Sequence, residues 1–314
     1  MAESEVSWPE LVALGEPMVE FNQTGQQSGR IFLQGFGGDT SNFAVAAARQ
    51  GARVGYLSAI GNDPYGQMLR QLWDNEGIDH AGVKKNNEAF TAIYFVTHDT
   101  QGHHFHFFRK DSAASLMQPD DLDAERIRNA KALHFSGISL AISEGARQTC
   151  WEAVRIARDN HVLVSFDTNL RLKLWSLEEA KKNTRHAISL CDICLPSLDD
   201  MTVITGKDNP NSIIEICHEW GAPLVALKMG DKGALISDGT QLWEVPPLEC
   251  IPVDATGAGD TFGGSFVHRL LQGDSPAQAG LYAATAAALS TEGYGAVEPI
   301  PHKDKVIANL TKDR

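Results

Sequence analysis

Short apolar runs rich in β-branched residues alternate along this chain with longer segments of helical periodicity, and this alternation restricts the fold more than any other feature. The predicted strands cover residues 11–14, 54–60, 132–135, 162–166, 193–195 and 224–228. The predicted helices cover residues 42–50, 66–76, 144–158, 177–190, 259–271 and 276–290. Strands and helices that alternate in this way are typical of βα units around a parallel sheet. We therefore predict an α/β protein with a mostly parallel central sheet.

Two stretches break this alternation and predict a second, smaller sheet. Residues 91–97 and 103–109 flank a turn at 99–102, as in an antiparallel hairpin, and residues 17–22 could add a strand to it. Ligands of parallel sheets bind beyond the carboxyl ends of the strands. A small sheet over that crevice would act as a lid that excludes water. We expect one domain over residues 1–314, with the lid inserted as 16–34 and 90–112.

The charge balance and the beginning of the chain exclude several kinds of partner. The 40 acidic residues outnumber the 27 basic ones and give a formal net charge of -13, which would repel nucleic acid. Residues 1–10 contain three glutamates and lack the apolar core of a signal peptide. No uninterrupted apolar run reaches the roughly 18 residues that a membrane span needs. We therefore expect a cytoplasmic protein with neither a nucleic-acid nor a membrane partner.

The most informative stretch for chemistry is Asp-Ala-Thr-Gly-Ala-Gly-Asp at 254–260, which runs into an apolar helical segment. Glycines at 257 and 259 permit a tight turn, and the N–H groups at the start of the following helix can bind an anion. Asp260 falls in the first helical turn, where a carboxylate could accept the proton of an attacking hydroxyl beside a phosphoryl group. From this segment alone, an aspartate that merely caps an ordinary helix is an equally good interpretation.

Other nucleotide-binding motifs do not fit. The chain has no Walker-type phosphate loop, since Gly206-Lys207 continues to Asp208, and protein-kinase signatures are absent. Gly257-Ala258-Gly259 could open a dinucleotide fingerprint, but the next glycine is at 263 and no acidic residue about 20 positions on ends a strand. An oxidoreductase that binds a nucleotide cofactor is therefore the weaker interpretation.

A second glycine-rich element, Gly-Phe-Gly-Gly-Asp-Thr at 35–40, is followed by Asn42 and later by Gly-Asn-Asp-Pro-Tyr-Gly at 61–66. With the motif at 254–260, this sequence resembles the ribokinase-like (PfkB) carbohydrate kinases over essentially its whole length. Within that family it is most similar to 2-keto-3-deoxygluconate kinases. The residues that carry this similarity lie at 15–20, 36–40, 108–114, 136–141, 167–171 and 174–175.

The resemblance implies a ribokinase-like three-layer αβα sandwich with a lid. It also implies an ATP-dependent, Mg²⁺-requiring kinase that phosphorylates the C6 hydroxyl of 2-keto-3-deoxygluconate to give 2-keto-3-deoxy-6-phosphogluconate. Asp260 would be the base, and the N–H groups of Gly257, Ala258 and Gly259 would form the anion hole. The implied substrate-binding residues are Gly38, Asn42, Tyr94, Phe107, Arg109, Arg171 and Asp260. The implied ATP-binding residues are Ser197, Lys228, Gly230, Gly257 and Gly259.

Two arginines suit a sugar acid, because a guanidinium pairs with a carboxylate through two parallel hydrogen bonds. Judged by spacing alone, however, Arg109 could be a solvated charge at a strand end and Arg171 a partner in a helix cap or ion pair. Lys228 could likewise be an ordinary surface lysine.

The sequence departs from the family pattern at three points. Ser197 and Asp200 stand where many members have Asn-x-x-Glu; Asp200 would contact Mg²⁺ through water. Ala255 replaces a frequent threonine, which leaves a monovalent-cation site open. Phe107 lacks the hydroxyl common at this position in 2-keto-3-deoxygluconate kinases.

Several alternatives remain open from the sequence. One is a related kinase of fructose, ribose, 5-keto-2-deoxygluconate or a nucleoside. Another is a sugar-binding regulator on the same fold that has lost catalysis. The open edge of the lid sheet could also be covered by a second subunit, which leaves a homo-oligomer as an alternative to a monomer.

Overall fold

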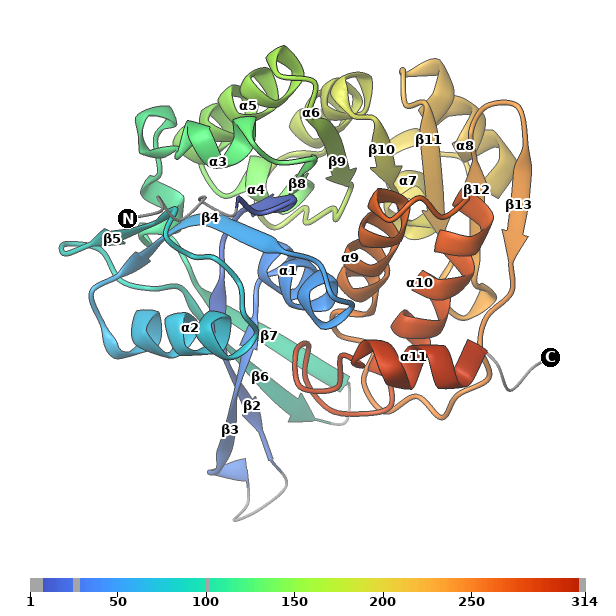
Figure 1. The fold of residues 1–314 in the computed structure, drawn as a ribbon. Coiled ribbons are helices and arrows are strands. Elements are labelled where there is room, and N and C mark those ends of the chain that lie inside the picture. Colours follow the sequence, from blue (N-terminus) through green and yellow to red (C-terminus); the bar gives the residue numbers. More distant parts are fainter. Residues whose placement is uncertain (1–7, 25–28, 100–101, 311–314) are drawn as a thin grey trace, which may run out of the picture.

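A nine-stranded sheet forms the middle layer of the protein, whose computed structural model describes residues 8–24, 29–99 and 102–310 (Figure 1). The strand order is β13-β12-β11-β10-β9-β8-β1-β4-β5. All neighbouring strands run parallel except β12, which is antiparallel to both β11 and β13. The strands are β1 (Leu11–Leu14), β4 (Val54–Gly61), β5 (Val83–Asn86), β8 (Ala132–Ser136), β9 (Leu163–Asp167), β10 (Ile193–Leu195), β11 (Leu224–Lys228), β12 (Ala234–Ser237) and β13 (Leu242–Val245).

Helices cover both faces of this sheet (Figure 1). On one face lie α1 (Asp39–Arg49), α2 (Pro64–Asn75), α9 (Ala258–Leu271) and α10 (Pro276–Ser290), with α11 (Lys303–Leu310) packed on α10. On the other face lie α3 (Ala124–Arg128), α4 (Gly137–Ala141), α5 (Glu144–Asp159), α6 (Leu177–Leu190), α7 (Leu198–Thr205) and α8 (Pro210–Glu219). Several of these helices begin where the sequence provides a side-chain cap; Ser143, Ser176 and Ser275, for example, each accept a hydrogen bond from the third helical N–H.

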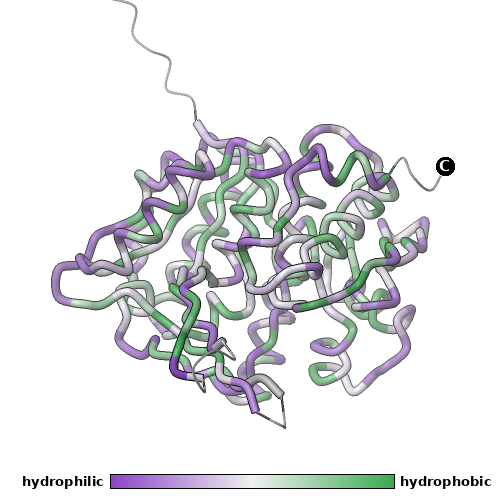
Figure 2. Tube along the Cα trace, turned by 90° about the horizontal axis from the view of Figure 1, so that it is seen from below, coloured by the Kyte–Doolittle hydropathy of each residue, from purple (hydrophilic) through white to green (hydrophobic). Residues whose placement is uncertain are grey.

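Strand β1 shows why the middle layer must be covered on both sides. Leu11 and Ala13 point into the core formed with α1 and α9, whereas Val12 and Leu14 point into the core formed with α5 and α6. Successive side chains of a strand face opposite ways, so an unbroken apolar strand requires two apolar neighbours. Figure 2 shows the same division along the trace, with hydrophobic residues concentrated in its interior and hydrophilic residues along its outer turns.

The small sheet has four strands in the order β3-β2-β6-β7 and projects from one end of the large sheet (Figure 1). Its strands are β2 (Met18–Gln23), β3 (Phe32–Gly37), β6 (Ile93–Asp99) and β7 (Gly102–Phe108). We call it the lid sheet. Strands β2 and β6 pair in parallel, and the two outer pairs are antiparallel.

The α/β class, the parallel sheet and all six predicted strands and six predicted helices are confirmed, with ends that shift by at most a few residues. The hairpin of β6 and β7 is also confirmed, although residues 100–101 at its tip lie outside the described residues. Four strands were not predicted: β3, β5, β12 and β13. Each of β5, β12 and β13 has only four residues, too few for a period of two to stand out.

None of the helices in the described part of the chain is long and apolar enough to cross a membrane.

Candidate active site

The carboxyl ends of β9 and β11 meet the start of α9 beside the lid sheet, and most of the predicted site residues lie there. Gly257 caps α9 with a φ of 77°, a left-handed conformation that favours glycine. The first N–H groups of a helix have no acceptor within it. In this helix the N–H of Ala258 already donates to the carbonyl oxygen of Ala255 at 3.2 Å. Gly259 and Asp260 therefore offer the N–H groups best placed to receive an anion, and the helix dipole adds to their positive potential.

Asp260, the predicted base, lies in the first turn of α9, and its Oδ2 accepts a hydrogen bond of 2.8 Å from Nδ2 of Asn42 on α1. Burial raises the pKa of Asp260 well above the ordinary 3.8, and the negative charge of Asp39 raises it further. The hydrogen bond from Asn42 and the charge of Lys228 act in the opposite direction. A carboxylate with a raised pKa is a stronger base, which suits it to accept the proton of an alcohol.

Lys228, at the end of β11, forms a buried ion pair with Asp167 at the end of β9. Their side chains are only 14% and 6% exposed. Burial raises the pKa of Asp167 while the charge of Lys228 lowers it. A Cβ atom built on Gly259 would lie 3.5 Å from Nζ of Lys228. The lysine predicted to contact ATP is therefore not a surface lysine. It lies against the glycine-rich start of α9, so that the charge of its ammonium group adds to the positive potential of the helix N-terminus.

Ser197 and Asp200 hold the loop that follows β9. Ser197 caps α7 by accepting a hydrogen bond of 3.1 Å from the N–H of Asp200. Oδ2 of Asp200 accepts hydrogen bonds from Oγ1 of Thr168 at 3.0 Å and from the N–H of Leu170 at 3.1 Å. Oδ2 of Asp200 thus already accepts two hydrogen bonds from the loop.

The described residues contain no group of three or more His, Cys, Asp or Glu side chains arranged to hold a metal ion. Mg²⁺ keeps several water ligands and usually binds through one or two carboxylates and substrate phosphates. Such a cation would arrive with the nucleotide, and contact with Asp200 through water remains a prediction for that residue. Gly230, the other residue predicted for ATP, begins the turn after β11 with a φ of 61°.

Among the residues predicted to bind the sugar, Gly38 turns the chain from β3 into α1. Its φ is 95°, and a Cβ atom there would lie 2.3 Å from the carbonyl oxygen of Glu16. Only glycine fits such a close approach to backbone. The guanidinium of Arg109, at the end of the lid, pairs with the fully buried carboxylate of Glu16, which also accepts a hydrogen bond of 2.7 Å from Oγ of Ser112. Arg109 therefore carries a charge that Glu16 already balances.

Of the remaining predicted residues, Tyr94 and Phe107 lie on the lid sheet and Arg171 lies in the loop after β9. Tyr94 is buried, and its hydroxyl donates to Glu20 of β2. The ring of Phe107 lies 5.4 Å from that of Tyr94, and 43% of the residue is exposed. Arg171 is exposed in the loop after β9, where its Nη1 donates to the carbonyl oxygen of Leu170 at 2.8 Å. No acidic side chain among the described residues pairs with it.

The sequence interpretation missed Glu16, Asp39, Asp167 and Asn169 as parts of this site. All four lie inside segments that carried the family resemblance, namely 15–20, 36–40 and 167–171. For Glu16, Asp167 and Asn169 the available signal was their position at or shortly after the ends of β1 and β9, because polar residues at the carboxyl ends of strands line the crevice of an α/β sheet. Asp39 opens α1 after the glycine-rich element.

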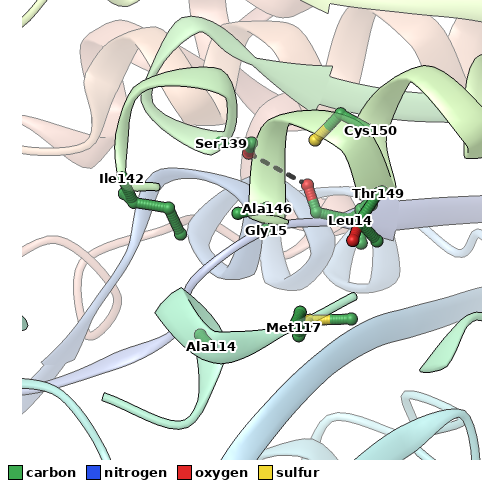
Figure 3. A pocket seen from close by; sticks show the side chains of 9 residues that line it. All are labelled: Leu14, Gly15, Ala114, Met117, Ser139, Ile142, Ala146, Thr149 and Cys150. Atoms are coloured by element: carbon green, nitrogen blue, oxygen red, sulfur yellow. Dashed lines mark hydrogen bonds between the residues drawn. The ribbon is translucent and has the colours of Figure 1, made fainter. Parts of the chain in front are cut away.

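A small cavity is lined by Leu14 and Gly15 together with residues of α4, of α5 and of the segment 114–117 (Figure 3). It is lined mainly by apolar side chains such as Met117 and Ile142, and Oγ of Ser139 is tied to the carbonyl oxygen of Leu14 at 3.1 Å. Its volume is about 10 Å³, which is at most the space of one water molecule. The cavity is therefore too small for a sugar.

Comparisons with known proteins agree with this geometry. Residues 9–303 match the model of the pfkB family carbohydrate kinases. A 2-dehydro-3-deoxygluconokinase of Thermoproteus tenax is 31% identical over 304 residues, which are 93% of this chain and 91% of that protein. A probable fructokinase-4 of Arabidopsis thaliana is 30% identical over 311 residues, or 94% and 95% of the two chains. The crystal structure of fructokinase from Vibrio cholerae O395, in its form with fructose, ADP and calcium ion, superposes with a TM-score of 0.86 at 28% identity and covers 96% of this chain and 99% of that one.

Proposed function

The chain belongs to the pfkB family of carbohydrate kinases, and on that premise we propose that it transfers the γ-phosphoryl group of ATP to the C6 hydroxyl of 2-keto-3-deoxygluconate. The observation that carries phosphoryl transfer is the meeting of three groups at the start of α9. These are the base Asp260, the N–H groups that begin with Gly259, and the ammonium of Lys228.

Each of these groups can take a separate role in the reaction. Asp260 accepts the hydroxyl proton as the C6 oxygen forms a bond to the γ-phosphorus, and the bond from that phosphorus to the β,γ-bridging oxygen breaks to release ADP. The N–H groups of α9 and Lys228 stabilise the charge that spreads over the transferred group. Asn42 keeps Asp260 in place. When bound, Mg²⁺ would neutralise charge on the phosphates, with Asp200 as its nearest protein contact through water.

Arg171 supports an anionic substrate. It stands after β9 without an acidic partner among the described residues, so its guanidinium can pair with the carboxylate of a sugar acid. Lid residues Tyr94 and Phe107 would cover the carbon chain.

A neutral hexose such as fructose is the second candidate, and one observation favours it. Glu16 balances the charge of Arg109, so that of the two predicted arginines only Arg171 lacks an acidic partner among the described residues. The fructokinases among the relatives are as similar to the chain as the 2-dehydro-3-deoxygluconokinase is.

The test is ADP release with ATP and a panel of 2-keto-3-deoxygluconate, 5-keto-2-deoxygluconate, fructose, ribose and a nucleoside. We expect the highest kcat/KM with 2-keto-3-deoxygluconate; a higher value with fructose would replace the sugar acid by the neutral sugar. Asp260→Asn should lower kcat by at least about 100-fold, as expected for a lost general base. Turnover near the wild-type rate in that variant would remove Asp260 as the base.

A further inference from the structure

A larger pocket lies at the β5 edge of the nine-stranded sheet, and none of the described residues that line it takes part in the mechanism above. Its volume is about 350 Å³, and ligand sites usually begin at roughly 300 Å³. Strand β5 pairs with β4 there, with Lys84 opposite Ala59. These two residues line one side of the pocket, and the segment that contains Ala113 and Met117 lines the other. Met117 also borders the small cavity of Figure 3.

Two lysines of the pocket have no ionic partner. Lys84 and Lys85 are adjacent on β5, and both are exposed. No acidic side chain of the described chain forms an ion pair with either of them. In a protein with a formal net charge of -13, two neighbouring lysines without an acidic partner create a local positive potential. Lysine binds phosphate groups as a point charge, so this end of the pocket favours an anion.

Two asparagines add hydrogen-bond donors. Oδ1 of Asn86 accepts hydrogen bonds from the N–H groups of Glu88 at 2.8 Å and of Ala89 at 3.0 Å. Oδ1 of Asn87 accepts one from Nδ2 of Asn62 at 3.0 Å. Both asparagines line the pocket, and the chain already uses the acceptor of each. Their Nδ2 groups donate to no described residue, so a ligand there meets donors and must itself supply acceptors.

Two carboxylates restrict the ligand further. Glu88 and Asp121 also line the pocket. An ionised carboxylate can only accept hydrogen bonds, so these side chains would repel a bare anion but would bind hydroxyl groups. Among the described lining residues none is aromatic, which leaves a nucleobase without a ring to stack on. The pocket therefore fits a molecule that has both a phosphate and several hydroxyls, which is the chemistry of a phosphorylated sugar.

The pocket lies where the hairpin of β6 and β7 joins the rest of the protein. The chain enters β6 through residues 86–92 and leaves β7 through residues 109–117, and both segments contribute to the lining. The N–H of Ala113 donates to the carbonyl oxygen of Phe90 at 2.9 Å, so the two segments are joined directly. A ligand in this pocket would contact both connections between the hairpin and the large sheet.

Ser112 links these connections to the predicted sugar site. Its Oγ donates to one oxygen of the Glu16 carboxylate at 2.7 Å, and the other oxygen pairs with Arg109. The N–H of Ser112 also donates to the carbonyl oxygen of Arg109 at 3.1 Å. A ligand shifts the population toward the conformation that it binds more tightly. Binding beside Ala113 would therefore change how Glu16 and Arg109 are held.

We propose that this pocket is a second ligand site, which takes a phosphorylated sugar and modulates sugar binding at the active site through the segments 86–92 and 109–117. Lys84 and Lys85 hold the phosphate, and Glu88 and Asp121 accept hydrogen bonds from the hydroxyls. The site itself is independent of the proposed function, and only the choice of probe for its test rests on it.

Calorimetric titration of the full chain tests the site. The probes are 2-keto-3-deoxy-6-phosphogluconate, which is the product of the proposed reaction, and inorganic phosphate. Wild type should bind one molecule of the sugar phosphate more than Lys84→Ala/Lys85→Ala does, because the active site is intact in both proteins. Inorganic phosphate should bind the pocket at least about 10-fold more weakly, since it brings no sugar hydroxyls to Glu88 and Asp121.

Activity with and without the sugar phosphate tests the coupling. Without it, wild type and Lys84→Ala/Lys85→Ala should have the same kcat/KM for the sugar, because neither lysine belongs to the active site. Competition at the active site affects both proteins equally. The change in kcat/KM that the probe causes should therefore differ between them only through the pocket, by at least about fivefold.

Lys181→Ala/Lys182→Ala is the matched control. It also removes two adjacent lysines, which lie on α6 and do not line the pocket. We expect it to match wild type in both measurements. An equal loss of binding in the two double variants would indicate general electrostatic attraction and would overturn the site.

Equal numbers of bound molecules in wild type and Lys84→Ala/Lys85→Ala would also overturn it, and equal affinities for the two probes would overturn the assignment to a sugar. An equal response of kcat/KM in both proteins would overturn the coupling. Failure of the proposed function is a different result, seen as no turnover of 2-keto-3-deoxygluconate, whereas the number of bound molecules needs no turnover. The coupling is then measured with the sugar that wild type phosphorylates, or through calorimetric affinity for a sugar if it phosphorylates none.

Discussion

Replacing Lys228 by methionine tests the buried ion pair with Asp167 by removing its charge while keeping most of its side-chain length. Both partners are largely inaccessible, with 14% and 6% of their side chains exposed. Loss of one partner leaves the other as an uncompensated buried charge, which costs about 3–5 kcal/mol. Because part of Lys228 reaches solvent, we take the lower end, about 3 kcal/mol.

This loss can be measured as a shift in Tm. The unfolding entropy is about 2.1 cal/mol/K per residue, so a chain of 314 residues should lose roughly 1.5 °C per kcal/mol. Lys228→Met should therefore lower the Tm by about 5 °C near neutral pH. The Asp167→Asn/Lys228→Met double variant, which has neither charge, should recover most of that loss.

The effect should also depend on pH. Burial raises the pKa of Asp167, and Lys228 opposes that rise, so the pKa of Asp167 should be higher still in Lys228→Met. A folded state with a raised carboxyl pKa binds more protons than the unfolded state, and its stability falls as the pH rises through that interval. The Tm deficit of the single variant should consequently be smaller at about pH 5 than at about pH 8.

Thermal unfolding followed by circular dichroism at both pH values, for wild type and the three variants with Asp167→Asn included, checks this reasoning. A Tm of Lys228→Met within about 1 °C of wild type at the higher pH would refute the assigned cost. So would a deficit that is equal at both pH values, since the charge of Asp167 would then not be its source.

Two further predictions concern activity. Burial and the charge of Asp39 raise the pKa of Asp260 above 3.8, so kcat/KM should fall on the acid side at a pH above that value. Asp39→Asn should move this fall to lower pH, because it removes one of the two causes. Identical pH profiles of wild type and Asp39→Asn would contradict the coupling of the two carboxylates. Arg171→Ala should raise the KM for the sugar acid roughly 10- to 100-fold, with the KM for ATP unchanged. Lys173→Ala, which removes an exposed cation two residues further on, is its control, and an equal effect in both variants would indicate nothing more than general electrostatic attraction.

Much of the reacting centre could be predicted from local sequence. Gly257, Gly259 and Asp260 occur together in one turn, so the start of α9 and its carboxylate follow from a few adjacent residues. Strands such as β1 could be predicted equally well, because their apolar composition matches burial on both faces of a sheet. In contrast, β3 was interpreted only as a glycine-rich element. Its Gly35 and Gly37 lower its strand propensity, and the strand is stabilised by its pairing with β2.

The charges of the site show the limit of such reasoning. Spacing alone left Arg109 as a solvated charge and Lys228 as a surface lysine, since nothing near either residue in the sequence names its partner. The structure pairs Arg109 with Glu16 and Lys228 with Asp167, and it joins Asn42 to Asp260 across 218 positions. In the sequence, Glu16 and Asp167 could be recognised only as members of motifs, and not as the partners of these two cations.

The sequence by itself determined the alternation of the main strands and helices, the glycine turns and the position of the carboxylate predicted to act as a base. These depend on periodicity and on backbone conformations that neighbouring residues impose. Tertiary structure decided which charges are neutralised and which remain available, leaving Arg171 without an acidic partner in the described chain and one oxygen of Asp39 without a donor. The reason is that burying a charge is costly unless a partner lies within contact distance, and such partners meet only when strands distant in the sequence end at the same edge of the sheet.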